Sequence, residues 1–99
     1  MRRLTIREEA EQDIRSALAW YQLQKPGLEL EFLEALDETL SFLLEKPRRV
    51  HRIKGTIMSF PMGRFPFSII HASTDEELLI IRVYHQKRNP RTRFRRLKR

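Results

Sequence analysis

The sequence Lys25-Pro26-Gly27 divides the first half of the chain into two segments of helical periodicity. Proline lacks the backbone N–H that a helix interior needs, and it disfavours helical geometry in the residue before it. Residues 7–24 and 28–46 can therefore each form a helix, but they cannot form one continuous helix. Because only three residues separate them, we expect the two helices to lie antiparallel as a hairpin.

Both segments carry apolar residues at intervals of three and four, which is the pattern of an amphipathic helix with one buried face. Acidic residues crowd the first turns of residues 7–24, where the helix dipole favours negative charge, and Pro47 ends the second segment. The predicted buried positions are Ala10, Ile14, Ala17, Leu18 and Tyr21 in the first helix, and Phe32, Ala35, Leu36, Leu40, Leu43 and Leu44 in the second.

The remaining apolar segments have the pattern of β-strands. Val50–Phe60 is interrupted by Gly55, which predicts a strand with a bulge or an irregular lead-in to a shorter strand. Phe65–Ala72 and Glu77–His85 are rich in aromatic and β-branched residues and are joined by a short polar segment. We expect these two to form an antiparallel hairpin. Arg3–Ile6 is a further short strand that precedes the first helix.

The element order β-α-α-β-β-β predicts an α+β fold. In this fold a helical hairpin packs on one face of a small, mostly antiparallel sheet, and the other face is open. A chain of 99 residues is long enough for one modest core, so we expect residues 1–99 to form a single domain with a basic C-terminal tail. The open sheet face would allow a homodimer.

The net charge of +7 is unevenly distributed along the chain. Residues 1–45 carry five basic and ten acidic side chains, residues 46–74 six basic and no acidic ones, residues 75–81 three acidic ones, and residues 82–99 nine basic ones. A basic surface attracts polyanions without sequence preference, so the second half of the chain indicates an acidic or nucleic-acid-associated partner. A solvated basic tail without a ligand is the simpler alternative.

The composition excludes several kinds of site. The chain has no cysteine, so it has neither a disulfide framework nor a thiolate metal site. His51 and His71 have no Asp or Glu at metal-ligand spacing, and we interpret both as structural or exposed. We therefore expect no metal and no cofactor. Without an apolar run of about 18 residues or a signal peptide, we expect a cytoplasmic protein that does not enter a membrane.

Three stretches of the chain resemble the RelE/ParE superfamily of bacterial toxins, which belong to type II toxin–antitoxin (plasmid stabilisation) systems. They are residues 8–22, residues 63–71 and residues 80–90, and their order and spacing carry the resemblance. The form His85-x-x-Arg88-x-Pro90 is more similar to the ParE branch than to RelE. The chain departs from many relatives in having Phe67 in place of a tyrosine, and Met58 and Ser59 in place of basic residues.

The resemblance implies a growth-inhibiting toxin that a cognate antitoxin neutralises. ParE-type members bind and inhibit DNA gyrase, and we favour this function because the departures leave an incomplete catalytic set. An acidic antitoxin segment could add a strand to a sheet edge or lay a helix in an apolar groove while its carboxylates meet the arginines. The residues we predict to bind the target or the antitoxin are Lys54, Arg64, Arg82, Arg88, Arg91 and Arg93.

The alternative that the resemblance implies is a RelE-like endoribonuclease that cuts mRNA on the ribosome. Cleavage through the 2′-hydroxyl needs a base, an acid and cations that stabilise the phosphate, and it needs no metal. His85 would be the acid or base with Tyr84 as its partner, and Arg64 and Arg82 would bind the phosphate, with Lys54 if it reaches the site.

Each candidate also has a structural interpretation. Successive strand residues point to opposite faces, so Tyr84 and His85 cannot both line the open face of a regular strand. In a regular strand Leu79, Ile81, Val83 and His85 would share one face. His85 would then be a core-edge residue bonded to a carbonyl, Tyr84 a packing residue and Arg64 a solvated loop charge.

A basic nucleic-acid-binding domain without toxicity is a third hypothesis for the chain.

Overall fold

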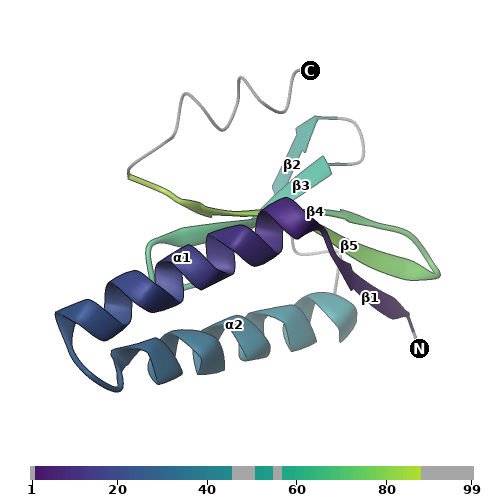
Figure 1. The fold of residues 1–99 in the computed structure, drawn as a ribbon. Coiled ribbons are helices and arrows are strands. Elements are labelled where there is room, and N and C mark those ends of the chain that lie inside the picture. The colour runs from purple at the N-terminus through teal and green to yellow at the C-terminus, as the bar shows by residue number, and fades with distance from the viewer. Residues whose placement is uncertain (1, 46–50, 55–56, 88–99) are drawn as a thin grey trace.

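The computed structural model describes residues 2–45, 51–54 and 57–87, and for residues 51–54 it describes the backbone alone. As the sequence predicts, a short strand precedes the helical hairpin and the other strands follow it (Figure 1). They are β1 (Arg3–Ile6), α1 (Glu8–Gln24), α2 (Leu28–Glu45), β2 (His51–Lys54), β3 (Ile57–Pro61), β4 (Phe67–Ser73) and β5 (Glu77–His85).

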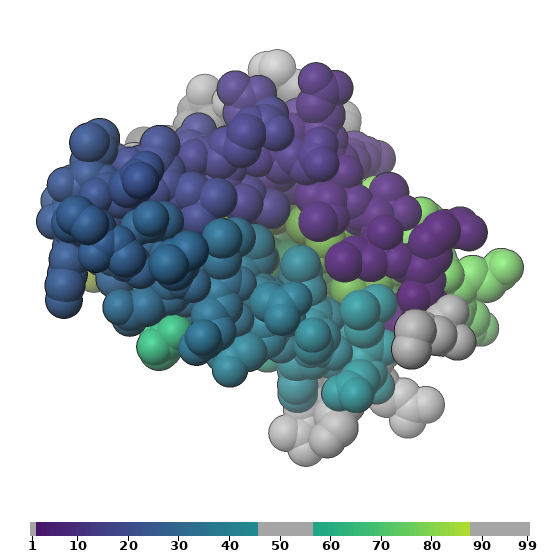
Figure 2. Space-filling model, turned by 60° about the horizontal axis from the view of Figure 1, so that its bottom comes forward, coloured from purple at the N-terminus to yellow at the C-terminus, as the bar shows by residue number. Residues whose placement is uncertain are grey.

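The described strands form one sheet in the order β1-β5-β4-β3-β2. β1 runs parallel to β5, and every other neighbouring pair is antiparallel. Both helices lie on the same side of this sheet (Figure 1), and together they cover that face of the molecule (Figure 2). The predicted α+β fold with a mostly antiparallel sheet is therefore confirmed. No helix in the described part of the chain is long and apolar enough to cross a membrane.

The region predicted as one interrupted strand, Val50–Phe60, contains two strands. His51 pairs with Ser59 and Lys54 with Ile57, so β2 and β3 lie antiparallel to each other. Val50 and residues 55–56 lie outside the described residues. Both arrangements present the same alternating apolar pattern, and only the pairing between the strands distinguishes a bulged strand from a hairpin.

The hairpin of α1 and α2 turns at the predicted break. The Lys25 N–H donates to the carbonyl of Tyr21 at 3.1 Å, which closes the last turn of α1. Gly27 then adopts a φ of 99°, a left-handed conformation that is strained for residues with a side chain. Its N–H donates to the carboxylate of Glu29 at 2.9 Å, at the start of α2. The sequence Lys25-Pro26-Gly27 therefore determines both the end of α1 and the reversal of the chain.

A cluster of four aromatic rings forms the centre of the core between the hairpin and the sheet. The ring of Phe32 is fully buried, and its centroid lies 5.5 Å from that of Tyr21, 5.3 Å from Phe65 and 5.2 Å from Phe67. The predicted buried positions of both helices are confirmed, with Ile14, Leu18 and Leu44 partly buried at the margin of the core.

A β-bulge in β5 changes the predicted alternation of its side chains. Ile70 pairs with Arg82 and His71 with Ile80, which leaves Ile81 as the extra residue of β5. Leu78 and Ile80 therefore share the core with Val83, whereas a regular strand would place Val83 on the opposite face. The prediction that Leu79, Ile81, Val83 and His85 share one face is wrong, because one inserted residue shifts a period of two by one position.

The sheet face away from the helices is filled at its centre. Ser68, Ile70 and Tyr84 point to this face and have exposed fractions of 5%, 0% and 4%. The side-chain amide of Gln86 donates to Ser68 Oγ at 3.0 Å and to the Phe67 carbonyl at 3.2 Å. The expectation of an open second face is therefore wrong for these positions, and the homodimer expected from that face stays a prediction without this support.

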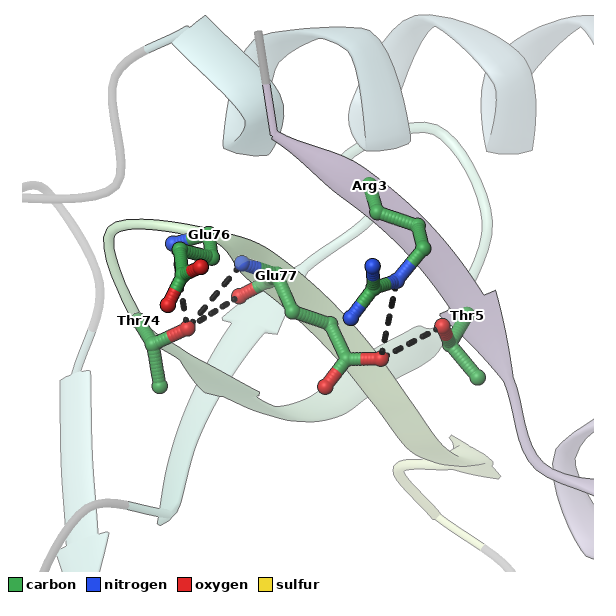
Figure 3. Close-up of polar contacts among 5 residues, drawn as sticks. All are labelled: Arg3, Thr5, Thr74, Glu76 and Glu77. Carbon is green, nitrogen blue, oxygen red and sulfur yellow. Dashed lines mark hydrogen bonds and ion pairs between the residues drawn. The ribbon is translucent and has the colours of Figure 1, made fainter.

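Side-chain contacts fasten the edge strand β1 to the start of β5 (Figure 3). Thr5 Oγ1 donates to the carboxylate of Glu77 at 2.6 Å, and Arg3 Nε lies 3.7 Å from the same oxygen. In the preceding turn, Thr74 Oγ1 accepts the backbone N–H groups of Glu76 and Glu77 at 3.3 and 3.0 Å. The Thr5–Glu77 hydrogen bond thus joins the two strands of the only parallel pairing that the structure describes.

The side chain of Arg2 joins the C-terminus of α2 to the β4–β5 turn. Its guanidinium donates to the carbonyls of Leu43 and Leu44, the latter at 2.8 Å, and to Ser73 Oγ. The last turn of α2 contains no basic residue, so Arg2 supplies the positive charge that a helix C-terminus favours.

Replacing Arg2 with alanine should lower the free energy of unfolding by about 2 kcal/mol, because several hydrogen bonds from a charged donor are lost. Urea denaturation followed by circular dichroism measures the change. Arg3→Ala is the matched control and should change stability by less than about 0.5 kcal/mol, since the Arg3 side chain is 72% exposed. Equal losses in the two variants would contradict a specific role for Arg2.

Candidate functional site

The guanidinium of Arg82, a candidate phosphate-binding group, is held by a carboxylate of α1. Nε and Nη2 of Arg82 donate to the two oxygens of Asp13 at 2.7 and 2.8 Å. The two side chains are only 17% and 16% exposed. This bidentate pair raises the pKa of Arg82, chiefly through its hydrogen bonds to Asp13. Arg82 is therefore permanently charged and already occupied by an anion.

Asp13 also completes the hydrogen bonding of β5 where β1 ends. The last strand pairing is between Ile6 and Ile80, and the Arg7 N–H then donates to the Ile80 carbonyl at 2.9 Å. Beyond this point no strand among the described residues pairs with this edge of β5, and Asp13 Oδ2 accepts the N–H of Val83 at 2.9 Å. The Asp13 carboxylate thus takes the place of a strand carbonyl.

The sequence indicates that Asp13 is partly buried, although Asp13 stands among other acidic residues at the start of α1. Asp13 lies three residues after Ala10 and four before Ala17, so it falls on the buried stripe of α1. An acid at such a position needs a buried partner, whereas an acid in the first turns of a helix is explained by the helix dipole alone. The dipole explanation accounts for the exposed neighbours, Glu8, Glu9 and Glu11.

Tyr84 is the third member of this cluster. Arg82 Nη1 donates to the Tyr84 hydroxyl at 2.8 Å, and the guanidinium carbon lies 4.3 Å from the centroid of the ring. Tyr84 is 4% exposed. The geometry agrees with the structural interpretation of Tyr84 as a packing residue, and its hydroxyl orients Arg82 from the side opposite Asp13.

His85 lies on the other face of β5, at the edge of the core. Its ring centroid is 5.1 Å from that of Phe67, and its Nδ1 accepts the N–H of Lys87 at 3.2 Å. The ring lines a small cavity of about 70 Å³ together with Trp20 and Tyr21. The core-edge position agrees with the structural interpretation of His85.

Arg64 is attached to the second helix. Its Nη2 donates to the Glu31 carbonyl at 3.3 Å, and Nη1 lies 4.0 Å from the Glu31 carboxylate. The guanidinium also lies 5.7 Å from the centroid of Phe65. Both partners of the ion pair are more than half exposed, so this contact contributes little stability.

The structure therefore brings together only two of the four candidate catalytic residues. Arg82 and Tyr84 are in contact, His85 points to the opposite face, and Arg64 is bonded to α2 whereas Arg82 is bonded to α1. The described residues contain no group of His, Asp or Glu that could hold a metal ion. Lys54 lies in β2 without a described side chain, and Arg88, Arg91 and Arg93 lie outside the described residues.

His71 is a buried histidine on the core face of β4, as its structural interpretation requires. It has no exposed surface, and its Nδ1 lies 3.1 Å from the carbonyl of Ile69. Since a carbonyl only accepts, Nδ1 carries the proton of the neutral ring. Nε2 is buried and has no hydrogen-bond partner among the described residues. Burial lowers the pKa of His71 below its usual value of 6.5, and the positive charge of Arg2 lowers it further.

This lowered pKa makes stability depend on pH. Well above pH 6.5 the His71 ring is neutral in both the folded and the unfolded chain. As the pH decreases below 6.5, the unfolded chain binds a proton before the folded chain does. The free energy of unfolding therefore decreases as the pH decreases, until the pKa of the folded state is reached. The slope from one proton is at most about 1.4 kcal/mol per pH unit. Urea denaturation at several pH values should show this slope removed by His71→Leu and retained by His85→Gln. The same slope in all three proteins would contradict the assignment.

Comparisons with known proteins agree with this architecture. The model of the ParE toxin of the type II toxin–antitoxin system parDE matches residues 4–90. Among solved structures, a chain from the chromosomal ParDE toxin–antitoxin system of P. aeruginosa aligns with a TM-score of 0.74 at 18% identity, over 86% of this chain and 96% of that chain. A point mutant of YafQ from E. coli aligns with a TM-score of 0.61 at 15% identity, over 87% and 94% of the two chains.

No curated protein sequence matches the chain. The two structural likenesses, each below 20% identity, show a shared fold. The family match extends over residues 4–90, from β1 past the end of β5, so it spans both helices and the residues of the Asp13–Arg82 cluster. The chain therefore belongs to the ParE toxin family of type II toxin–antitoxin systems.

Proposed function

We propose that the chain inhibits growth by binding DNA gyrase, without catalysing a reaction, and that a cognate antitoxin neutralises it in the cytoplasm. The observation that supports a binding function is the bidentate pair between Arg82 and Asp13. A phosphate that approached Arg82 would have to displace a carboxylate that also accepts the N–H of Val83. The family match supports the toxin class and the antitoxin as partner.

The positions of the other candidates support the same proposal. RNA cleavage requires a proton acceptor, a proton donor and a cation around one phosphate, each within hydrogen-bond distance of its target. Tyr84 and His85 point to opposite faces of β5, and Arg64 is bonded to Glu31 of α2. In this arrangement the basic residues contribute to a binding surface, on which they would meet acidic groups of gyrase or of the antitoxin.

The experiment that tests this proposal is induced expression of the chain alone, with growth, primer extension on total mRNA and gyrase supercoiling measured in parallel. Growth arrest with intact messages and inhibited supercoiling is the expected result. Fresh cuts in translated messages would show a RelE-like ribonuclease. Unimpaired growth together with salt-sensitive nucleic-acid binding would show the third function, a basic domain without toxicity.

His85→Ala should leave growth inhibition within about twofold of the original chain, because a binding protein needs no acid or base, whereas loss of general acid–base catalysis costs about 10²–10⁴-fold. Colony counts after induction measure toxicity. His85→Gln controls for the ring's packing against Phe67, and circular dichroism confirms that both variants fold. Loss of toxicity in both folded variants, with loss of mRNA cuts, would contradict the proposal.

A further inference from the structure

A groove separates α2 from the corner between β3 and β4. Its volume is about 480 Å³, and its floor is apolar, with Phe42 of α2 and Phe60 of β3 stacked at a centroid distance of 5.1 Å and Met62 beside them. Thr39 and Glu38 form its α2 side, and Arg64 lies at its end. In Figure 2, green atoms of the segment between β3 and β4 emerge beside α2. The cluster around Arg82 does not include any residue of this groove.

Glu38 lines the groove, and further exposed acidic side chains lie on the same side of α2. Glu31, Glu34, Glu38 and Glu45 follow one another at intervals of three, four and seven residues, so they lie along one side of the helix, and all are exposed. α2 contains no Lys or Arg over its 18 residues. Glu31 faces Arg64, whereas the other three glutamates have no ion-pair partner among the described residues. The groove therefore fits a segment that is basic and carries apolar anchors.

The chain's own C-terminus has this composition. Residues 91–99, RTRFRRLKR, contain six Arg or Lys in nine positions and no acid. Phe94 and Leu97 are their only large apolar residues, three positions apart. This segment lies beyond the part of the chain that the family match covers, which ends at residue 90.

The described chain also ends within reach of the groove. The Gln86 N–H donates to the Pro66 carbonyl at 2.7 Å, and the Met62 N–H donates to the Phe67 carbonyl at 2.9 Å. β5 and β3 are both neighbours of β4, so the end of β5 lies two strand spacings, about 10 Å, from the end of β3. Seven further residues, 88–94, can span about 23 Å. Phe94 can therefore reach Phe60 and Phe42 from the same chain.

We propose that the groove between α2 and the β3–β4 corner binds the chain's own C-terminal segment, residues 91–99. Phe94 contacts the floor of Phe42 and Phe60, and the basic residues around it face Glu34, Glu38 and Glu45. Because the two parts belong to one chain, the segment is present at an effective concentration of the order of millimolar, so weak contacts suffice. Docking withdraws basic residues from other acidic partners. This inference does not depend on gyrase as the target.

A spin label placed on the tail tests the docking in the full-length chain. The sequence has no cysteine, so Thr92→Cys creates a single attachment site. The label should broaden the backbone amide signals of residues 34–45 and 60–64 in ¹⁵N-labelled protein. In a mixture of spin-labelled unenriched chain with ¹⁵N-enriched unlabelled chain, the broadening should be absent. Equal broadening in the mixture would overturn the proposal in favour of a second copy as occupant, and no broadening at the groove would overturn docking altogether.

Two charge reversals on neighbouring positions of α2 provide the matched comparison. Glu38 lines the groove, whereas Asp37 is exposed on another side of the helix. Glu38→Lys should reduce the docked population about threefold or more, because the attraction between Glu38 and the basic tail becomes a repulsion between two positive charges. Asp37→Lys should leave the docked population unchanged. Phe94→Asp should abolish the broadening without unfolding the domain. Equal responses of the two lysine variants, or docking that survives Phe94→Asp, would overturn the proposed contacts.

Discussion

Replacing Asp13 with alanine should lower the free energy of unfolding by about 3 kcal/mol. The substitution leaves the guanidinium of Arg82 without its bidentate partner and the N–H of Val83 without its acceptor. Removing one member of a buried charged pair costs about 3–5 kcal/mol, and the 16–17% exposure of these side chains places the effect at the lower end. Urea denaturation followed by circular dichroism measures the loss, with an unchanged m-value as evidence of the same folded state.

Controls on the same helix separate this effect from the helix dipole. Glu9→Ala removes an exposed acid close to the N-terminus of α1 and should cost less than about 0.5 kcal/mol. In a double-mutant cycle, the combination of Asp13→Ala with Arg82→Ala should cost less than the sum of the single changes, because no unpaired charge is left. Additive losses, or a cost for Asp13→Ala no larger than that of Glu9→Ala, would show that the pair does not stabilise the fold.

Replacing Phe32 with alanine should lower the free energy of unfolding by about 4 kcal/mol. Phe32 is fully buried and its ring contacts Tyr21, Phe65 and Phe67, so truncation removes buried apolar area and leaves a cavity between α2 and the sheet. Domains of this size are stable by about 5–15 kcal/mol, so the variant should be close to unfolding at 37 °C. Urea and thermal denaturation measure the change.

Two further substitutions define the origin of this loss. Phe32→Leu keeps most of the volume and should cost clearly less than Phe32→Ala, about 1–2 kcal/mol. Leu30→Ala, two positions earlier on the exposed side of α2, should change stability by less than about 0.5 kcal/mol, since Leu30 is 64% exposed. Similar losses for Phe32→Ala and Leu30→Ala would mean that helix propensity, and not the aromatic core, decides the stability of α2.

The helical hairpin and the β4–β5 hairpin could be predicted because their causes are local. Pro26 and Gly27 end α1 and reverse the chain whatever the rest of the protein does, and the apolar positions of each helix are three and four residues apart. The same holds for the short polar turn between β4 and β5. Residues that act through their backbone conformation or their periodicity therefore reveal their role in the sequence.

The sequence identified candidate residues of the site but could not decide what role each of them has. Arg82, Tyr84 and His85 stand out because charged and polar groups follow an apolar strand, and this pattern is the same for a catalytic site and for an anchored ion pair. Asp13, which decides between the two for Arg82, lies 69 positions away in the sequence. The partner could be recognised only by asking why an acid occupies the buried stripe of α1.

The sequence by itself determined the fold class, the positions of both helices with their buried faces, and the family to which the chain belongs. Tertiary structure alone decided the pairing of β2 with β3, the bulge at Ile81, and the two long-range contacts of Arg2 and Asp13. The physical reason is that periodicity and turn chemistry act between near neighbours. Strand register and the partners of buried charges depend instead on which distant segments meet when the chain closes.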